Sequence, residues 1–140
     1  MDPSRERYYR GLFLVAAVYD LVLGVVFTFF HKPAFELLDV TPPESGYIPL
    51  LGSFLIVIGV AYYLIWKGDL ARNRDMIFVG TLYKLAYASI TLIFWAIGDI
   101  PNVAFAAVFG LADAIFFVLM LECWLYLGRQ AATGDTQAVA

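Results

Sequence analysis

Three ionisable residues stand inside apolar stretches of this sequence, where their chemistry is unusual. Lys84 lies in LYKLAYA, Asp20 in VYDLVLG and Asp113 in GLADAIF. Each such side chain costs about 2.5 to 3.5 kcal/mol at the centre of a membrane helix. Pairing between a lysine and aspartates offsets that cost, and intramembrane ionisable groups are candidate sites for protons, cations or polar ligands. We therefore take these three residues as the candidate binding residues.

The elements that must position them are four long apolar runs. The chain has 140 residues, 62% of them hydrophobic, which is far above the share in a soluble domain. A helix needs about 20 residues to cross a bilayer, and four runs are long enough: 11–30, 47–66, 76–97 and 103–127. The sequence predicts an all-α integral membrane four-helix bundle, with one domain over 1–128 and a mobile cytoplasmic tail over 129–140.

The basic residues predict the orientation of the bundle. With four spans, the N-terminus, the segment 67–75 and the C-terminus lie on one side of the membrane. That side carries seven of the lysines and arginines outside the spans, and the other side carries only Lys32. Under the positive-inside rule we expect both termini in the cytoplasm, and we place the protein in a bacterial inner membrane.

The connecting segments carry helix and turn signals. Asp2 followed by Pro3 is typical of a helix start. The segment 31–46 is predicted to contain a short helical turn at the outer surface, ended by Pro42 and Pro43. Gly98 and Pro101 supply a turn between the third and fourth spans, which must then be antiparallel neighbours.

Depth in the membrane predicts which of the charged groups meet. At about 1.5 Å per residue, Asp20 and Lys84 lie about 14 Å and about 12 Å from the cytoplasmic edge, and Asp113 lies about 15 Å from the outer edge. Small residues flank all three on their helix faces, as expected of inward-facing positions. The second span carries no charge and offers a stripe for packing: Gly52, Ile56, Gly59 and Tyr63.

The three charges do not balance, since there are two acids and one base. We expect one aspartate to pair with Lys84 and the other to be protonated or hydrogen-bonded to a nearby tyrosine, which would make a proton site. The candidate tyrosines are Tyr19, Tyr83 and Tyr87. A purely structural reading stays open beside this one, in which the buried ion pair only fixes which helices face one another.

Glu122 behaves differently from the cluster. It follows Asp113 by nine residues, which at about 100° per residue places it on the opposite side of the helix. We expect it to reach the cytoplasmic surface toward Arg129 or Arg10, or to contact a partner subunit.

Other chemistry has little support in the sequence. The single Cys123 and single His31 predict no metal site, and no catalytic motif can be assembled. The net charge of −3 without a basic patch argues against nucleic acid as a partner. No cofactor is evident, although the aromatic share of 17% could accommodate a flat hydrophobic ligand such as a quinone or a lipid.

The pattern of short motifs resembles a known group of membrane proteins. The stretches VYDLVLG, PAFELLDV, VGTLYKLAYA and GLADAIFFVLML are similar to those of small four-span bacterial membrane proteins related to the DoxX-like families. The resemblance runs from about Arg10 to Leu127, with Lys84 and Asp113 at positions that are polar in such proteins. It implies a four-span architecture and, by analogy with members beside quinone-linked oxidoreductases, an accessory role.

Two functions of different class follow from these observations. The first is a non-catalytic accessory or structural subunit of a larger membrane assembly, including self-association, with Glu122 at a contact surface. The second is an autonomous binder or carrier of a small lipophilic molecule, cation or proton that uses the Lys84 cluster. A membrane enzyme with Asp113 as general base would require a pocket open to substrate beside that carboxylate, and the sequence leans against it.

Overall fold

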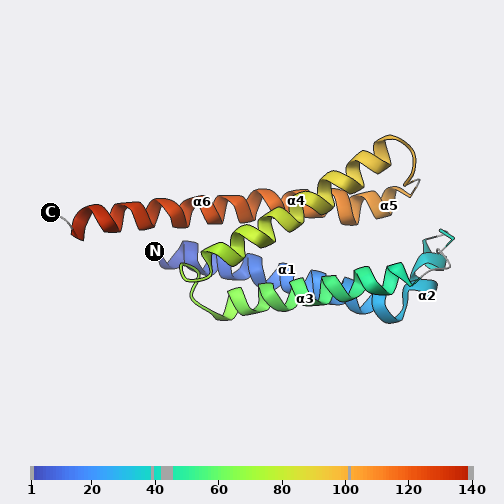
Figure 1. Cartoon of the computed structure of the whole chain (residues 1–140), viewed down its shortest axis with the longest axis horizontal. Coiled ribbons are helices and arrows are strands. Elements are labelled where there is room, and N and C mark those ends of the chain that lie inside the picture. The colour runs from blue at the N-terminus through green and yellow to red at the C-terminus, as the bar shows by residue number, and fades with distance from the viewer. Residues whose placement is uncertain (1, 39, 42–45, 101, 139–140) are drawn as a thin grey trace.

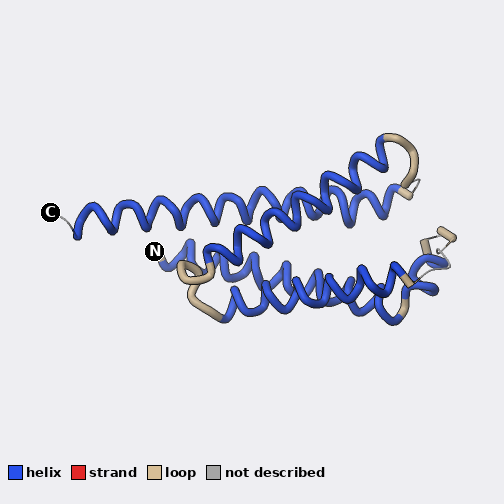
Figure 2. Tube along the Cα trace, in the orientation of Figure 1, coloured by secondary structure: helices blue, strands red, loops and turns tan. Residues whose placement is uncertain are grey.

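The structure, a computed structural model, describes residues 2–38, 40–41, 46–100 and 102–138. These residues are almost entirely helical, with short connections (Figure 2). The elements in chain order are α1 (Pro3–Phe29), α2 (His31–Leu37), α3 (Tyr47–Lys67), α4 (Arg74–Ala96), α5 (Val103–Phe105), the π-helix η1 (Ala106–Leu111) and α6 (Ala112–Ala138). Four helical stretches are long and apolar enough to cross a membrane, which confirms the predicted all-α fold with four candidate spans.

The helices associate as two antiparallel pairs. Helix α1 packs along α3, and α4 packs along η1 and α6, as Figure 1 shows. The expected neighbourhood of the third and fourth spans is thus confirmed. The N-terminus, the α3–α4 loop and the C-terminal part of α6 lie toward one end of the molecule, and α2 and α5 lie toward the other (Figure 1). We call the end that carries α2 and α5 the α2 end.

Close backbone approach holds α1 against α3. A Cβ atom added at Gly24 would lie 2.7 Å from the backbone nitrogen of Ile56, and one at Gly52 would lie 2.6 Å from that of Thr28. Both distances are too short for any side chain, so only glycine allows this contact. Glycine at helix crossings is a common way for membrane helices to gain van der Waals contact.

The packing stripe of α3 differs from the prediction at one position. Gly52 and Gly59 are buried as expected, but Tyr63 is 40% exposed and Tyr62 is 1% exposed. The buried positions are 52, 55, 59, 62 and 65, and their separations of three and four match the seam of two helices crossing at a small angle. The predicted stripe therefore leaves the buried seam at its last residue, Tyr63.

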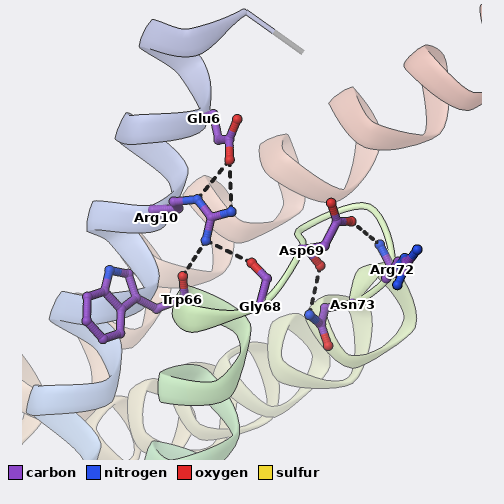
Figure 3. Close-up of polar contacts among 7 residues, drawn as sticks. All are labelled: Glu6, Arg10, Trp66, Gly68, Asp69, Arg72 and Asn73. Carbon is purple, nitrogen blue, oxygen red and sulfur yellow. Dashed lines mark hydrogen bonds and ion pairs between the residues drawn. The ribbon is translucent and has the colours of Figure 1, made fainter.

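Arg10 ties the start of α1 to the end of α3 (Figure 3). Its Nη1 donates hydrogen bonds to the carbonyl oxygens of Trp66 and Gly68, at 2.6 and 2.8 Å. Its Nε donates to Glu6 Oε1 at 2.9 Å. The last carbonyls of a helix lack partners within the helix and carry partial negative charge, so a guanidinium there satisfies them and stabilises the helix end.

The predicted boundaries hold in part. Helix α1 begins at Pro3 as expected, without a hydrogen bond from the Asp2 side chain. Helix α2 is the expected short helix of the 31–46 segment, whereas Pro42 and Pro43 lie outside the described residues. Gly98 has a φ of 89° in the turn after α4, a left-handed conformation that favours glycine; Pro101 lies outside the described residues.

The described part of the C-terminal segment is helical. Helix α6 runs on from the apolar span to Ala138, where the sequence predicted a separate tail from residue 129. Small and polar residues such as those of 129–138 continue a helix readily when a long helix already precedes them, because propagation is far easier than nucleation. The mobility of this segment stays a prediction.

Candidate functional site

Lys84 lies between Asp20 and Asp113 at the centre of the molecule. Its Nζ is 2.7 Å from Asp20 Oδ1 and 2.8 Å from Asp113 Oδ1. The side chains of Lys84 and Asp20 are 0% exposed, and that of Asp113 is 2% exposed. The buried cluster expected from depth is therefore present, and it joins α1, α4 and α6.

The cluster differs from the prediction in how its charges pair. One aspartate was expected to pair with Lys84, while the other was expected to be protonated or hydrogen-bonded to a tyrosine. In the structure both aspartates accept a hydrogen bond from Lys84 Nζ, and the protonation state of each stays a prediction. A lysine ammonium has three donors, so it can serve two carboxylates at once. Asp20 Oδ2 is buried and has no hydrogen-bond partner among the described residues.

Aromatic rings surround the ammonium. Lys84 Nζ lies 4.6 Å from the ring centroid of Tyr19, 5.2 Å from Phe116, and 5.7 Å from both Tyr62 and Tyr83. A cation within about 6 Å of a ring centroid is attracted to the ring, and more strongly where water is excluded. The rings therefore stabilise the lysine charge and close the cluster to solvent.

Tyr62 is a site residue that the sequence analysis missed. Its hydroxyl donates a hydrogen bond of 2.8 Å to the carbonyl oxygen of Gly80. A Cβ atom at Gly80 would lie 2.5 Å from the Tyr62 ring, so this glycine makes room for the ring beside Lys84. The available signal was the spacing 52, 55, 59 and 62 on α3, which places Tyr62 on the buried seam.

The sequence analysis also did not predict the π-helix η1. It ends at Leu111, two residues before Asp113, and the backbone N–H of Ala112 bonds to the carbonyl of Ala107 in the wide π pattern. Tyr19 donates a hydrogen bond of 2.5 Å from its hydroxyl to the carbonyl of Val108, within this turn. A π-turn widens the helix and offsets the residues after it, and such turns are common near functional sites. Here it ends two residues before Asp113, the cluster residue of α6.

An apolar cavity of about 120 Å³ lies toward the α2 end. Its aromatic and polar lining consists of Phe27, Phe35, Phe105, Phe109, Tyr87 and Thr91, and α3 adds Ile48, Leu51 and Leu55. Phe27 and Phe109 stack at 5.3 Å between ring centroids. The cavity thus lies where the two helix pairs meet through aromatic side chains.

Tyr87 connects this cavity to the charged cluster. It lines the cavity, and its ring lies 4.7 Å from that of Tyr83. Tyr83 in turn lies against Lys84. Of the predicted binding tyrosines, Tyr19 and Tyr83 therefore border the ammonium, while Tyr87 borders the cavity.

Glu122 lies apart from the cluster, on the exposed side of α6. Its Oε1 accepts a hydrogen bond of 3.1 Å from the Tyr9 hydroxyl. Arg10, one of its expected partners, instead binds Glu6 and the end of α3. Contact between Glu122 and a partner subunit stays a prediction.

No family model matches the chain, and no curated protein or solved structure is similar to it at a significant level. The resemblance to the DoxX-like families thus stays a prediction. The function must be argued from the cluster and the cavity.

Proposed function

We propose that this chain is a non-catalytic membrane protein that binds a small lipophilic molecule in the aromatic cavity at the α2 end. The observation that carries the proposal is the cavity itself, about 120 Å³ and lined by four phenylalanines. An engineered apolar cavity of about 150 Å³ stays dry and binds benzene. A cavity of this size suits a single ring, or the end of a hydrocarbon chain.

The lining favours a ligand that is apolar with one polar group. Tyr87 and Thr91 are its polar residues, and both come from α4. Ligand sites are commonly apolar, with a few polar groups that fix orientation. A phenol or a quinone ring fits this pattern, and a quinone is also the ligand that the aromatic composition suggested.

In this proposal the charged cluster has a structural role, because it links the two helix pairs. Lys84 and both aspartates are fully enclosed, which leaves no room for a ligand between them. Buried ion pairs can fix which helices face one another. The cluster would then hold α4 in the position where Tyr87 borders the cavity.

Filling the cavity tests the proposal. Leu55→Phe adds a ring at a cavity residue that is 2% exposed, and Val57→Phe adds the same ring at a position of α3 that is 64% exposed. We expect toluene and p-cresol to raise the Tm of the purified wild-type protein and of Val57→Phe, but not of Leu55→Phe. A ligand at 100 times its Kd stabilises by about 2.7 kcal/mol.

Two outcomes would contradict this function. Equal shifts in all three proteins would mean that the probes act on detergent or on the outer surface. If the wild-type protein shows no shift and is stable only beside a co-purifying membrane protein, the accessory-subunit hypothesis is favoured instead.

We further propose that both termini face the cytoplasm of a bacterial cell. The asymmetry of seven basic residues against one supports this orientation. A test needs a background without the native thiol, Cys123→Ala, in which Ser4→Cys and Lys32→Cys are labelled separately in intact cells with a membrane-impermeant maleimide. We expect label on Lys32→Cys only, and label on Ser4→Cys alone would reverse the orientation.

A further inference from the structure

The charges in the Lys84 cluster leave one negative charge uncompensated. Two carboxylates face one ammonium, and Lys84 is the only buried basic residue in the part of the chain that the structure describes. The other titratable groups that face the cluster are tyrosines: Tyr19 from α1, Tyr62 from α3 and Tyr83 from α4. None of these brings a positive charge. An unpaired charge in a membrane interior is costly.

The two aspartates are not equivalent in their surroundings. Asp20 is 0% exposed, and its Oδ2 lacks any hydrogen-bond donor among the described residues. An ionised carboxylate spreads its charge over both oxygens, and a buried oxygen without a donor loses its hydration without compensation. Asp113 Oδ2 is not among the buried atoms without a partner. The excess charge is therefore least favourable on Asp20.

We propose that Asp20 is a proton-binding site. The Asp20 carboxylate takes one proton from water and becomes a carboxylic acid, while Lys84 and Asp113 remain an ion pair. The cluster is then neutral. This inference rests on the cluster and is independent of ligand binding in the cavity, so either can fail without the other.

The position of Asp20 gives proton binding a structural consequence. Asp20 belongs to the α1–α3 pair, and its Lys84 contact crosses to the α4–α6 pair. When Asp20 loses its proton, the two carboxylates on opposite pairs repel each other and compete for one ammonium. Proton release therefore places an uncompensated negative charge at the contact between the pairs.

Infrared spectroscopy of the wild-type protein in lipid at neutral pH tests the proposal. We expect one band from a protonated carboxyl group, displaced in heavy water, and we expect Glu122→Gln to leave it unchanged because Glu122 lies outside the cluster. Lys84→Met should add a second such band, because both acids then lack a counter-ion. A wild-type spectrum without the band would overturn the proposal.

An isotope label decides which aspartate holds the proton. Each variant is compared with and without ¹³C at the glutamate side-chain carboxyl. The label should move the band of the protonated carboxyl to lower frequency in Asp20→Glu and leave it in place in Asp113→Glu. The opposite result would place the proton on Asp113 and overturn the assignment.

Thermal stability provides a second measurement if either glutamate variant does not fold. Asparagine has nearly the shape of a protonated aspartate, so Asp20→Asn should keep the wild-type Tm. Asp113→Asn should lower it, since the ionised partner of Lys84 is removed. Equal losses in both variants would contradict a proton on Asp20.

Discussion

Lys84 on α4 and Asp20 on α1 lie in direct contact, with 2.7 Å between Nζ and Oδ1, although 64 residues separate them in the chain. The same ammonium also contacts Asp113 on α6. One lysine therefore binds an acid in its own helix pair and an acid in the other pair. The Asp20 contact crosses between the two pairs, which also meet through apolar side chains and through hydrogen bonds from Tyr9, Tyr19 and Tyr62.

Removing the lysine charge should destabilise the bundle. Lys84→Met leaves two buried acids without a cation, and breaking a buried ion pair from one side costs about 3 to 5 kcal/mol. Unfolding of the purified protein in detergent, followed by circular dichroism, measures this loss. Lys67→Met, at an exposed position at the end of α3, is the matched control and should have little effect.

A neutral cluster should recover part of that stability. The triple variant Asp20→Asn, Lys84→Met, Asp113→Asn removes all three charges together, and buried ionic groups can often be replaced by neutral ones without loss. If the triple variant is no more stable than Lys84→Met alone, the loss comes from packing around the lysine stem and not from unpaired acids.

The close contact between α1 and α3 predicts that alanine is destabilising at Gly52 but not at Gly11. Gly52→Ala would place a Cβ 2.6 Å from the Thr28 backbone nitrogen, and backbone cannot move aside as a flexible side chain can. Overpacking of this kind costs about 1 to 3 kcal/mol. Gly11→Ala has no atom within 4 Å of the new Cβ and should stabilise α1 by up to about 1 kcal/mol. Thermal denaturation of both variants checks the pair, and equal effects would argue against this helix crossing.

Two adjacent tyrosines should respond differently to loss of the hydroxyl. Tyr62→Phe removes the buried hydrogen bond to the Gly80 carbonyl and should lower the free energy of unfolding by about 1 kcal/mol. Tyr63→Phe changes a residue that is 40% exposed and should have almost no effect. A larger loss for Tyr63 would mean that the predicted stripe through Tyr63, and not the one observed through Tyr62, is the packing seam.

Arg10 should be needed for a stable end of α3. Arg10→Ala removes the donors to the carbonyls of Trp66 and Gly68, and hydrogen bonds from a charged group contribute about 1.5 to 3 kcal/mol. We expect faster amide hydrogen exchange in the last turn of α3 and in the loop that follows it. The exposed Arg7 gives the control Arg7→Ala, which should leave exchange there unchanged.

The sequence alone determined the number of candidate membrane-spanning helices and which charges could meet. Length and apolar content predict a membrane helix directly, because a bilayer accepts only a segment that is long enough and has its backbone hydrogen-bonded within itself. Depth follows from counting residues along such helices. Lys84, Asp20 and Asp113 could therefore be grouped before any contact was known.

Only the tertiary structure decided how each helix is turned about its axis. In lipid both faces of a helix are apolar, so the pattern that marks the buried face of a soluble helix is weak. For this reason the sequence analysis put Tyr63 on the buried seam of α3, where the structure has Tyr62. It also predicted neither the π-helix before Asp113 nor the cavity between the pairs. The contact of Lys84 with both aspartates was likewise decided by the tertiary structure, because it depends on the side chains of three helices meeting at one point.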